Sequence, residues 1–377
     1  MPRKHAAACR YMMHVPDPLS AIDLQLDADA VGAVSEAEQS VRDLNDTQHP
    51  ALEPLAWLLL RTESIASSKI EGMQVDARHL ARAEAKRSLD KRIGPETERV
   101  LANIGAMQMA IDTATHAGPL TVAHLSAVHH QLMAGDINYH APGEVRTRQN
   151  WIGGNNYTPC GADFVPPSAD RVPALLDDLC AYVARDSESP LVQAALAHAQ
   201  FETIHPFADG NGRTGRALIH IVLRRRGLAR TFVPPVSLVF AAHRHRYIDA
   251  LMRFRDGDVA AWIVHFANAT THAARTATRY LQQVDALRAS WREQLRAYRP
   301  VRADAVAWQI IDQLPAQPIV TGPGLVQSTD RTKAAVSQAI DDLCAAGILQ
   351  SASEHKRNRL YEAPELMALL RSLELEG

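Results

Sequence analysis

The chain has few cysteines, few aromatic residues and almost no net charge. Its four cysteines have no paired spacing among the 377 residues, so we expect no zinc site and a reducing, cytoplasmic setting. A formal net charge of −2 gives no global attraction to nucleic acid or to a membrane surface. Long apolar runs are also missing, since residues 55–60 form only a short patch that ends at Arg61. Composition thus predicts a cytoplasmic protein without a membrane partner or a signal peptide.

The chain is instead rich in apolar residues at helical spacing. Its 46% hydrophobic content and its length suffice for two or three domains with buried cores. Apolar side chains recur at helical intervals in residues 190–203 and again in residues 216–226. We therefore expect a mainly α-helical fold, with a loop between these two helices.

That loop, residues 205–216, reads HPFADGNGRTGR. A base, a carboxylate, an amide, three glycines and two arginines fall within this dozen. Free N–H groups at the start of a helix bind phosphate, and glycines let the backbone approach an anion closely. The string therefore predicts a site for a nucleoside triphosphate and a divalent metal ion. A Walker phosphate loop is excluded because no lysine follows the glycines.

Each polar residue of the loop suits one part of that chemistry. Asp209 offers the hard oxygen that Mg²⁺ prefers, and His205 has the pKa range of a general base. Arg213 and Arg216 are three apart, so they project from one helix face and can fork onto phosphates. Asn211 can donate its amide to a phosphate oxygen. A zinc site is disfavoured because His205 and Asp209 alone supply too few ligands.

The same string matches the signature H-x-F-x-[DE]-G-N-G-R-x-x-R, so the chain resembles Fic-domain proteins. Residues 143–154 and 164–167 resemble the flap of that family, a β-hairpin beside the active site. Residues 63–72 resemble the N-terminal segment with the inhibitory motif [ST]-x-x-x-E-[GN]. The resemblance covers about residues 50–270 and implies a Fic-type helical core with a small hairpin flap.

The resemblance implies transfer of AMP from ATP, with Mg²⁺, to a Ser, Thr or Tyr hydroxyl of a target protein or of the chain itself. It assigns the general base to His205 and the metal ligand to Asp209. The target would dock along the flap, residues 144–167. The resemblance places these residues at the nucleotide: Gly210, Asn211, Gly212, Arg213, Arg216 and Tyr247.

An inhibitory helix is expected at about residues 62–72, with Ser67 and Glu71 as its motif residues. In the resembling family this glutamate pairs with the second motif arginine, here Arg216, and so withdraws it from the γ-phosphate. The same glutamate could instead orient water that removes AMP from a modified target. The sequence leaves these two roles open.

The expected domains are an N-terminal helical region (1–115), a Fic core (116–275), a linker helix (276–300) and a winged-helix-like domain (301–377). The prediction of a winged-helix-like domain rests on a helix at 332–346, which is followed by a polar stretch between short apolar runs. That basic stretch contains His355, Lys356, Arg357 and Arg359.

DNA contact through residues 321–361 would place the helix at 332–346 in the major groove, with Arg331 and Lys333 near its start. Acidic residues, including Asp341 and Asp342, oppose this, so a protein-docking or dimer-forming module is left open equally. A homo-oligomer is left open as well. The alternative function is a DNA- or protein-binding regulator whose Fic core senses nucleotide.

Overall fold

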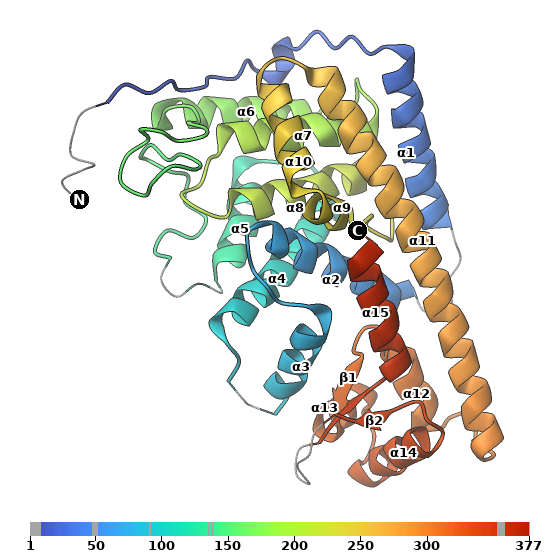
Figure 1. Ribbon diagram of the computed structural model, residues 1–377. Coiled ribbons are helices and arrows are strands. Elements are labelled where there is room, and N and C mark those ends of the chain that lie inside the picture. Colours follow the sequence, from blue (N-terminus) through green and yellow to red (C-terminus); the bar gives the residue numbers. More distant parts are fainter. Residues whose placement is uncertain are drawn as a thin grey trace. The chain divides into compact units, whose positions relative to one another are not determined.

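The computed structural model describes residues 9–46, 52–89, 92–134, 136, 139–352 and 359–376. As expected, the chain is mainly helical, with one small sheet (Figure 1). It divides into two compact units, each built from three stretches of sequence. The first unit comprises Met1–Glu38, Gly105–Leu228 and His243–Asn268, and the second comprises Gln39–Ile104, Ala229–Ala242 and Ala269–Gly377.

Helices dominate both units. Those of the first unit are α5 (Val122–Met133), α6 (Val172–Val183), α7 (Pro190–Ile204), α8 (Asn211–Arg225) and α10 (Arg244–Arg255), with short turns at Leu19–Ala21 and Ala169–Arg171. Those of the second are α2 (Leu52–Ile70), α3 (Ala77–Arg87), α9 (Val236–Ala242), α12 (Val306–Gln313), α13 (Gly322–Thr329), α14 (Lys333–Ala345) and α15 (Pro364–Glu376). Three further helices contribute residues to both units: α1 (Ala28–Asp46), α4 (Pro95–Thr115) and α11 (Val259–Tyr298). None of the described helices is long and apolar enough to cross a membrane.

Helix α7 is the centre of the first unit. Every residue of α7 from Leu191 to Ile204 is buried, including its polar side chains. Its closest partner is α8, and α6 also packs on it. A helix that is largely apolar on all sides must be enclosed by other elements, and this places α7 in the core. The helix predicted at residues 190–203 is thereby confirmed almost to the residue.

Helix α8 begins earlier than its apolar spacing indicated. It starts at Asn211, not at residue 216, because Gly210 provides a left-handed N-cap (φ 76°) and the glycine-rich string continues as helix. The prediction that the whole string 205–216 forms a loop is therefore wrong, and only residues 205–210 connect the two helices. The prediction that glycines lie at the start of the second helix is confirmed.

The flap also differs from the predicted hairpin. Residues 144–147 form no strand, and the only pairing in the region is an antiparallel bridge between Ile152 and Phe164. The turn expected at residues 155–156 lies within a longer loop between these two bridge residues. Arg146 is buried and its backbone amide donates to the carbonyl of Pro206, so this stretch cannot be an exposed strand.

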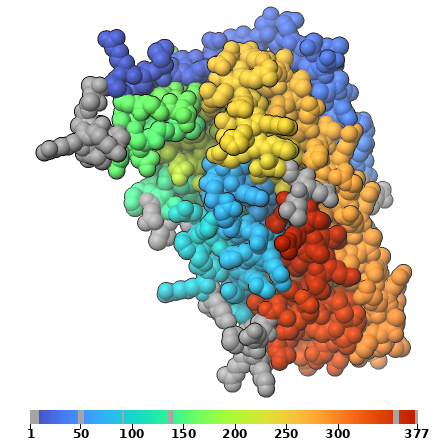
Figure 2. All heavy atoms as spheres, in the orientation of Figure 1, coloured from blue at the N-terminus to red at the C-terminus, as the bar shows by residue number. Residues whose placement is uncertain are grey.

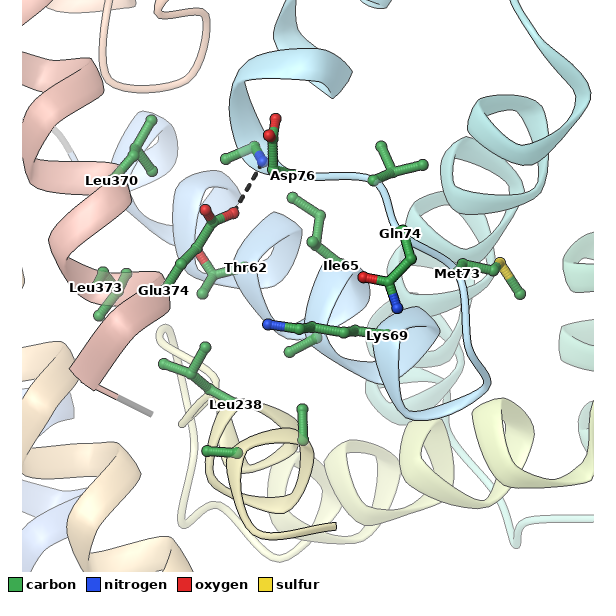
Figure 3. A pocket seen from close by; sticks show the side chains of 15 residues that line it. Thr62, Ile65, Lys69, Met73, Gln74, Asp76, Leu238, Leu370, Leu373 and Glu374 are labelled. Atoms are coloured by element: carbon green, nitrogen blue, oxygen red, sulfur yellow. Dashed lines mark hydrogen bonds between the residues drawn. The ribbon is translucent and has the colours of Figure 1, made fainter.

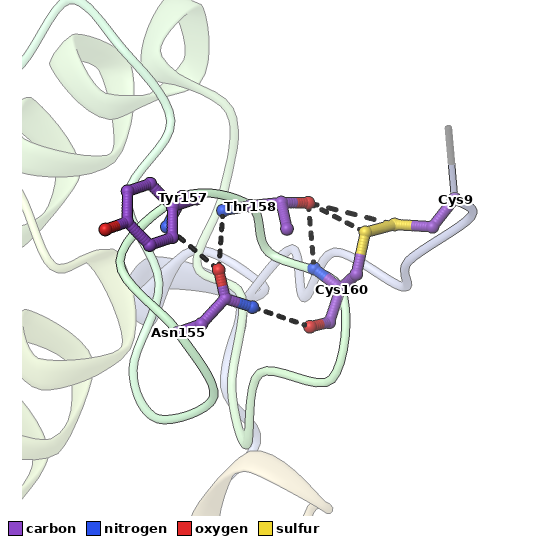
Figure 4. Close-up of a disulfide and its surroundings, with 5 residues drawn as sticks. All are labelled: Cys9, Asn155, Tyr157, Thr158 and Cys160. Atoms are coloured by element: carbon purple, nitrogen blue, oxygen red, sulfur yellow. Dashed lines mark hydrogen bonds between the residues drawn. A yellow bond between two sulfur atoms is a disulfide. The ribbon is translucent and has the colours of Figure 1, made fainter. Parts of the chain in front are cut away.

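The N-terminal segment lies against the flap, where Figure 2 shows dark blue beside green. The amide of His14 donates to the carbonyl of Val165 at 2.9 Å. Cys9 forms a disulfide with Cys160 across a sequence separation of 151 residues, next to the hydroxyl of Thr158 (Figure 4). A disulfide is at odds with the expected reducing setting, and sequence spacing does not reveal a pair so far apart. The reducing setting loses its main support.

In the second unit, α2 is joined to two neighbours by buried polar contacts. Both carboxylate oxygens of Glu63, which is fully buried, accept hydrogen bonds from Ser237 at the start of α9. The amide nitrogen of Asn103 on α4 donates to the carbonyl of Ser64 and to the hydroxyl of Ser68. These contacts hold the C-terminal half of α2, which includes the expected inhibitory segment.

A pocket of about 210 Å³ lies in the second unit between α2, α9 and α15 (Figure 3). Its walls are mixed: Ile65, Leu238 and Leu370 are among the apolar lining residues, and Gln74 and Lys69 are among the polar ones. On the opposite side, Glu374 of α15 accepts a hydrogen bond from the backbone amide of Ala77 at 2.8 Å. This carboxylate thereby satisfies a free N–H group at the N-terminus of α3.

The C-terminal part of the second unit contains the sheet. Its strands are β1 (Ile319–Thr321), β2 (Gln350–Ser351) and β3 (Leu360–Glu362), paired antiparallel in the order β1-β3-β2. Thr321 and Thr332 cap α13 and α14 with their hydroxyls. Of the expected basic stretch, His355, Lys356 and Arg357 lie outside the described residues. The winged-helix character of this part stays a prediction.

Candidate active site

The predicted motif forms a tight connection between two helices. Helix α7 ends at His205, which takes a left-handed conformation (φ 50°, ψ 60°) that few non-glycine residues adopt. Left-handed backbone is unfavourable for L-residues, so neighbouring side chains must hold His205 in this conformation. His205 thereby marks the point where the chain leaves α7 and begins the loop to α8.

Asn211 closes this loop from its far end. Its Oδ1 accepts a hydrogen bond from the amide of Phe207, and its Nδ2 donates to the carbonyl of Phe207, both at 2.8 Å. The Asn211 side chain is 2% exposed. Its amide is therefore engaged in shaping the loop, and donation to a phosphate stays a prediction.

Gly210 stands where a side chain would be crowded. A Cβ atom there would lie 3.0 Å from Sδ of Met133, 3.2 Å from Cδ2 of Leu132 and 3.3 Å from Nε2 of His129. Its φ of 76° also favours glycine. Helix α5 thus packs directly against the backbone at the start of α8.

His129 of α5 packs against the same loop. Its ring stacks on that of Phe207 with a centroid distance of 3.8 Å and an interplanar angle of 1°. Its Nδ1 accepts from the amide of Gly143, which leaves Nε2–H to donate to the carbonyl of Asp209 at 3.0 Å. Burial, the largest cause, lowers the pKa of His129 to about 4. The ring is therefore neutral at physiological pH and serves as a fixed donor.

The start of α8 has the features of an anion site. Helix N-termini present free N–H groups and a positive dipole end, and glycine at 212 leaves the backbone open beside them. Arg213 and Arg216 lie on this first part of the helix and are 6% and 1% exposed. Two guanidinium groups with little access to water interact strongly with bound phosphate.

Asp209 is the candidate metal ligand. It is exposed, and its Oδ1 accepts from the amide of Gly210 at 2.7 Å. In the described part of the chain, no three His, Cys, Asp or Glu side chains are grouped as a metal cage. Mg²⁺ commonly uses one or two carboxylates and completes its shell with phosphate oxygens and water, so the donor set at Asp209 fits Mg²⁺ bound together with a nucleotide.

Tyr247 is also buried, on α10. It is 3% exposed, and its hydroxyl lies 2.8 Å from Nε2 of His198 on α7. Its ring is also near the indole of Trp262, with centroids 6.3 Å apart. Burial lowers the pKa of His198 to about 3, so this histidine is neutral. A role for Tyr247 beside the nucleotide base stays a prediction.

The inhibitory residues belong to the second unit. Ser67 is fully buried on α2, whereas Glu71 follows the end of that helix and is exposed. The amide of Glu71 donates to the carbonyl of Ser68, and Gly72 then turns the chain with φ 87°. Gly72 thus stands just past the C-terminus of α2, where glycine commonly ends a helix. The pairing of Glu71 with Arg216 stays a prediction.

Three supporting residues escaped the sequence analysis. Arg146 and Asn150 of the flap hydrogen-bond to backbone carbonyls of the motif, and His129 holds Asp209. Arg146 and its nearest motif partner are 59 positions apart, and His129 and Asp209 are 80 apart. No short-range spacing reveals such contacts. The one hint is that Arg146 and Asn150 lie inside the segment 143–154 that resembles the flap.

Comparison with known proteins agrees with this geometry. Residues 119–223 match the Fic/DOC family, and residues 31–112 match the Fic/DOC family N-terminal region. Among curated proteins, "Protein adenylyltransferase Fic" from Culex quinquefasciatus is 29% identical over 50% of this chain and 35% of its own length. "Protein adenylyltransferase fic-1" from Caenorhabditis briggsae is 31% identical over 40% of this chain and 27% of its own length. The chain thus spans about a third of these relatives.

Solved structures show the same fold. A Fic family protein from Desulfovibrio desulfuricans has a TM-score of 0.55 at 22% identity, covering 90% of this chain and 97% of that one. Fic-1 from Caenorhabditis elegans has a TM-score of 0.54 at 19% identity, covering 68% and 74%. The solved structures show that the chain has the Fic fold, and the complete motif between α7 and α8 lies within the segment that matches the Fic/DOC family.

Proposed function

We propose that this chain is an autoinhibited protein adenylyltransferase. It moves AMP from ATP to a Ser, Thr or Tyr hydroxyl of a target protein, or of itself, and releases pyrophosphate. The observation that supports this most is the short loop 205–210, which joins His205 at the end of α7 to the N-terminus of α8. The names of the curated relatives point to the same activity.

In this proposal each residue of the motif has a separate role in the transfer. His205 accepts the proton of the target hydroxyl, whose oxygen bonds to the α-phosphorus as the bond to the bridging oxygen of the β-phosphate breaks. Pyrophosphate leaves with that electron pair. Arg213 and Arg216 neutralise charge on the phosphates, with Arg216 at the γ-phosphate, and the backbone at Gly210 and Gly212 holds the α-phosphate.

Mg²⁺ held by Asp209 would neutralise charge on the α- and β-phosphates. The target segment docks along the flap, residues 144–167, whose main chain tolerates many sequences. Because positioning and charge stabilisation dominate this reaction class, a rigid loop between two buried helix ends suits it.

Autoinhibition rests on Glu71, by analogy with the family motif. If its carboxylate pairs with Arg216, the γ-phosphate loses its partner. A charge-assisted hydrogen bond contributes about 1.5–3 kcal/mol, which corresponds to about ten- to a hundredfold in population. Removal of AMP from modified targets by a water oriented at Glu71 is a second role of the same site.

The test is transfer of α-phosphate label from ATP with Mg²⁺ to proteins of a cell lysate. Wild type, Glu71→Gly and His205→Ala are compared. We expect covalent label on protein that is about ten- to a hundredfold stronger in Glu71→Gly and lower by about 10² to 10⁴ in His205→Ala. Equal or weaker labelling by Glu71→Gly would refute autoinhibition. No label in any form would refute the transferase and favour the regulator.

The regulator has one structural feature in its favour. Arg331 and Lys333 are exposed at the N-terminal end of α14, where a recognition helix presents its cations. Asp342 of the same helix is buried and pairs with Arg299 at 3.3 Å, so it does not oppose DNA directly. We rank this function second because a nucleotide sensor has little need of His205.

A further inference from the structure

Arg146 is a buried arginine whose side chain is devoted to backbone carbonyls. Its Nε donates to the carbonyl of His205 at 2.9 Å, and its Nη2 donates to those of Ile204 and Pro167. Its Nη1 donates to the carbonyl of Arg148. The residue is 6% exposed. Burial lowers the pKa of its guanidinium to about 10, so it stays charged at neutral pH.

The end of α7 needs such a group. The last carbonyls of a helix have no partner within the helix and form the negative end of its dipole. Here the chain turns left-handed at His205 and continues into Pro206, which has no N–H to offer. The guanidinium satisfies the carbonyls of Ile204 and His205 together. The fork of donors on arginine suits two neighbouring acceptors, whereas an ammonium reaches them singly.

Asn150 reaches the same loop from further along the flap. Its Nδ2 donates to the carbonyls of His205 and Phe207, at 3.3 and 2.8 Å. The carbonyls on both sides of Pro206 are thus held by one amide. The backbone amide of Arg146 adds a third contact, to the carbonyl of Pro206 at 2.9 Å. Every carbonyl from residue 204 to residue 207 is therefore bound by residue 146 or 150.

We propose that Arg146, assisted by Asn150, is a positioning residue that holds His205 in its left-handed conformation and so aims the imidazole at the target hydroxyl. This inference rests on the proposed function, in which His205 is the general base. The same guanidinium binds the carbonyl of Pro167 at the other end of the flap. One side chain therefore fixes both the base and the segment along which the target docks.

A purely structural role predicts something different. If Arg146 only stabilised the fold, its loss would weaken nucleotide binding and turnover alike. A positioning role predicts a loss in kcat with little change in the KM for ATP, because the phosphate-binding groups lie on α8. Displacing a reacting group by about 1 Å can lower the rate about 10²-fold.

The experiment compares full-length Arg146→Met and Arg146→Lys with the control Arg171→Met. Arg171 is an exposed arginine of the same unit, outside the flap. Label transfer is measured against ATP concentration. We expect kcat to fall about 10²-fold in Arg146→Met and about tenfold in Arg146→Lys, with the KM for ATP within about threefold of wild type. Added methylguanidine should restore part of the Arg146→Met activity, and Arg171→Met should match wild type.

A kcat within twofold of wild type, or a rise in KM that accounts for the whole loss, would overturn the proposal. If Arg146→Met does not fold, Arg146→Lys is judged by the same criteria. A second readout does not depend on activity: the ¹³C shift of the His205 Cα, identified by its absence in His205→Gln. We expect it to change in both Arg146 variants and not in Arg171→Met. An unchanged shift refutes the positioning role even if wild type transfers no label.

Discussion

At the scale of single residues, His129 makes the motif sensitive to acid. Its pKa is lowered from 6.5 to about 4, mainly by burial, so the unfolded chain binds this proton more readily than the folded chain. Its contribution to stability is fully present above pH 6.5 and is lost as the pH falls toward 4. The difference in pKa corresponds to about 3 kcal/mol at most.

We expect the free energy of unfolding to fall less steeply over that pH range in His129→Gln than in wild type. Urea unfolding followed by circular dichroism at several pH values measures this slope. His116→Gln is the control, since His116 is exposed at the end of α4. Parallel pH profiles for wild type and His129→Gln would contradict the assignment.

At the scale of elements, α15 is joined to α3 through Glu374. Its carboxylate accepts from the amide of Ala77, and burial raises its pKa (Figure 3). The Glu374 carboxylate is therefore favourable as a hydrogen-bond acceptor, whereas its negative charge is unfavourable because the group is buried. We expect Glu374→Gln, which keeps an acceptor oxygen, to be at least as stable as wild type, and Glu374→Leu to lose about 1 kcal/mol. Urea unfolding at neutral pH measures both, and equal losses in the two variants would argue against this account.

At the scale of the whole molecule, the disulfide links the N-terminal segment to the flap loop (Figure 4). Cross-links that close long loops typically stabilise by about 2–4 kcal/mol. We expect a reductant to lower the unfolding free energy of wild type by this amount and to leave Cys160→Ser unchanged. Cys344→Ser, which removes a free thiol, should behave as wild type.

Peptide mapping of the alkylated, unreduced protein identifies the linkage directly. Cys9 and Cys160 should appear in one cross-linked peptide, while Cys180 and Cys344 are alkylated after unfolding. Alkylation of all four cysteines without reductant would show that the pair does not form in the purified protein.

Helices were predictable where the signal is local. The helix at 190–203 was predicted because apolar spacing acts within a few residues, and the structure adds an N-cap at Ser189 and a proline at the first helical position. The start of α8 was placed too late because glycine and asparagine disfavour helices intrinsically. Here Gly210 and Asn211 are kept by the packing of α5 and by the closure on Phe207. The prediction of a hairpin in the flap was wrong for a related reason. The side chain of Arg146 hydrogen-bonds to the carbonyl of His205 at the end of α7, and residues 144–147 do not pair as a β-strand.

The sequence by itself determined the resemblance to Fic-domain proteins, the position of the motif between two helices and the candidate residues for the chemistry, because these are carried by short, ordered strings. Only the tertiary structure decided how that motif is held. His129, Arg146 and the Cys9–Cys160 pair act across 80, 59 and 151 positions of chain. Such contacts depend on the path of the whole backbone, whereas propensity and spacing act over a few residues.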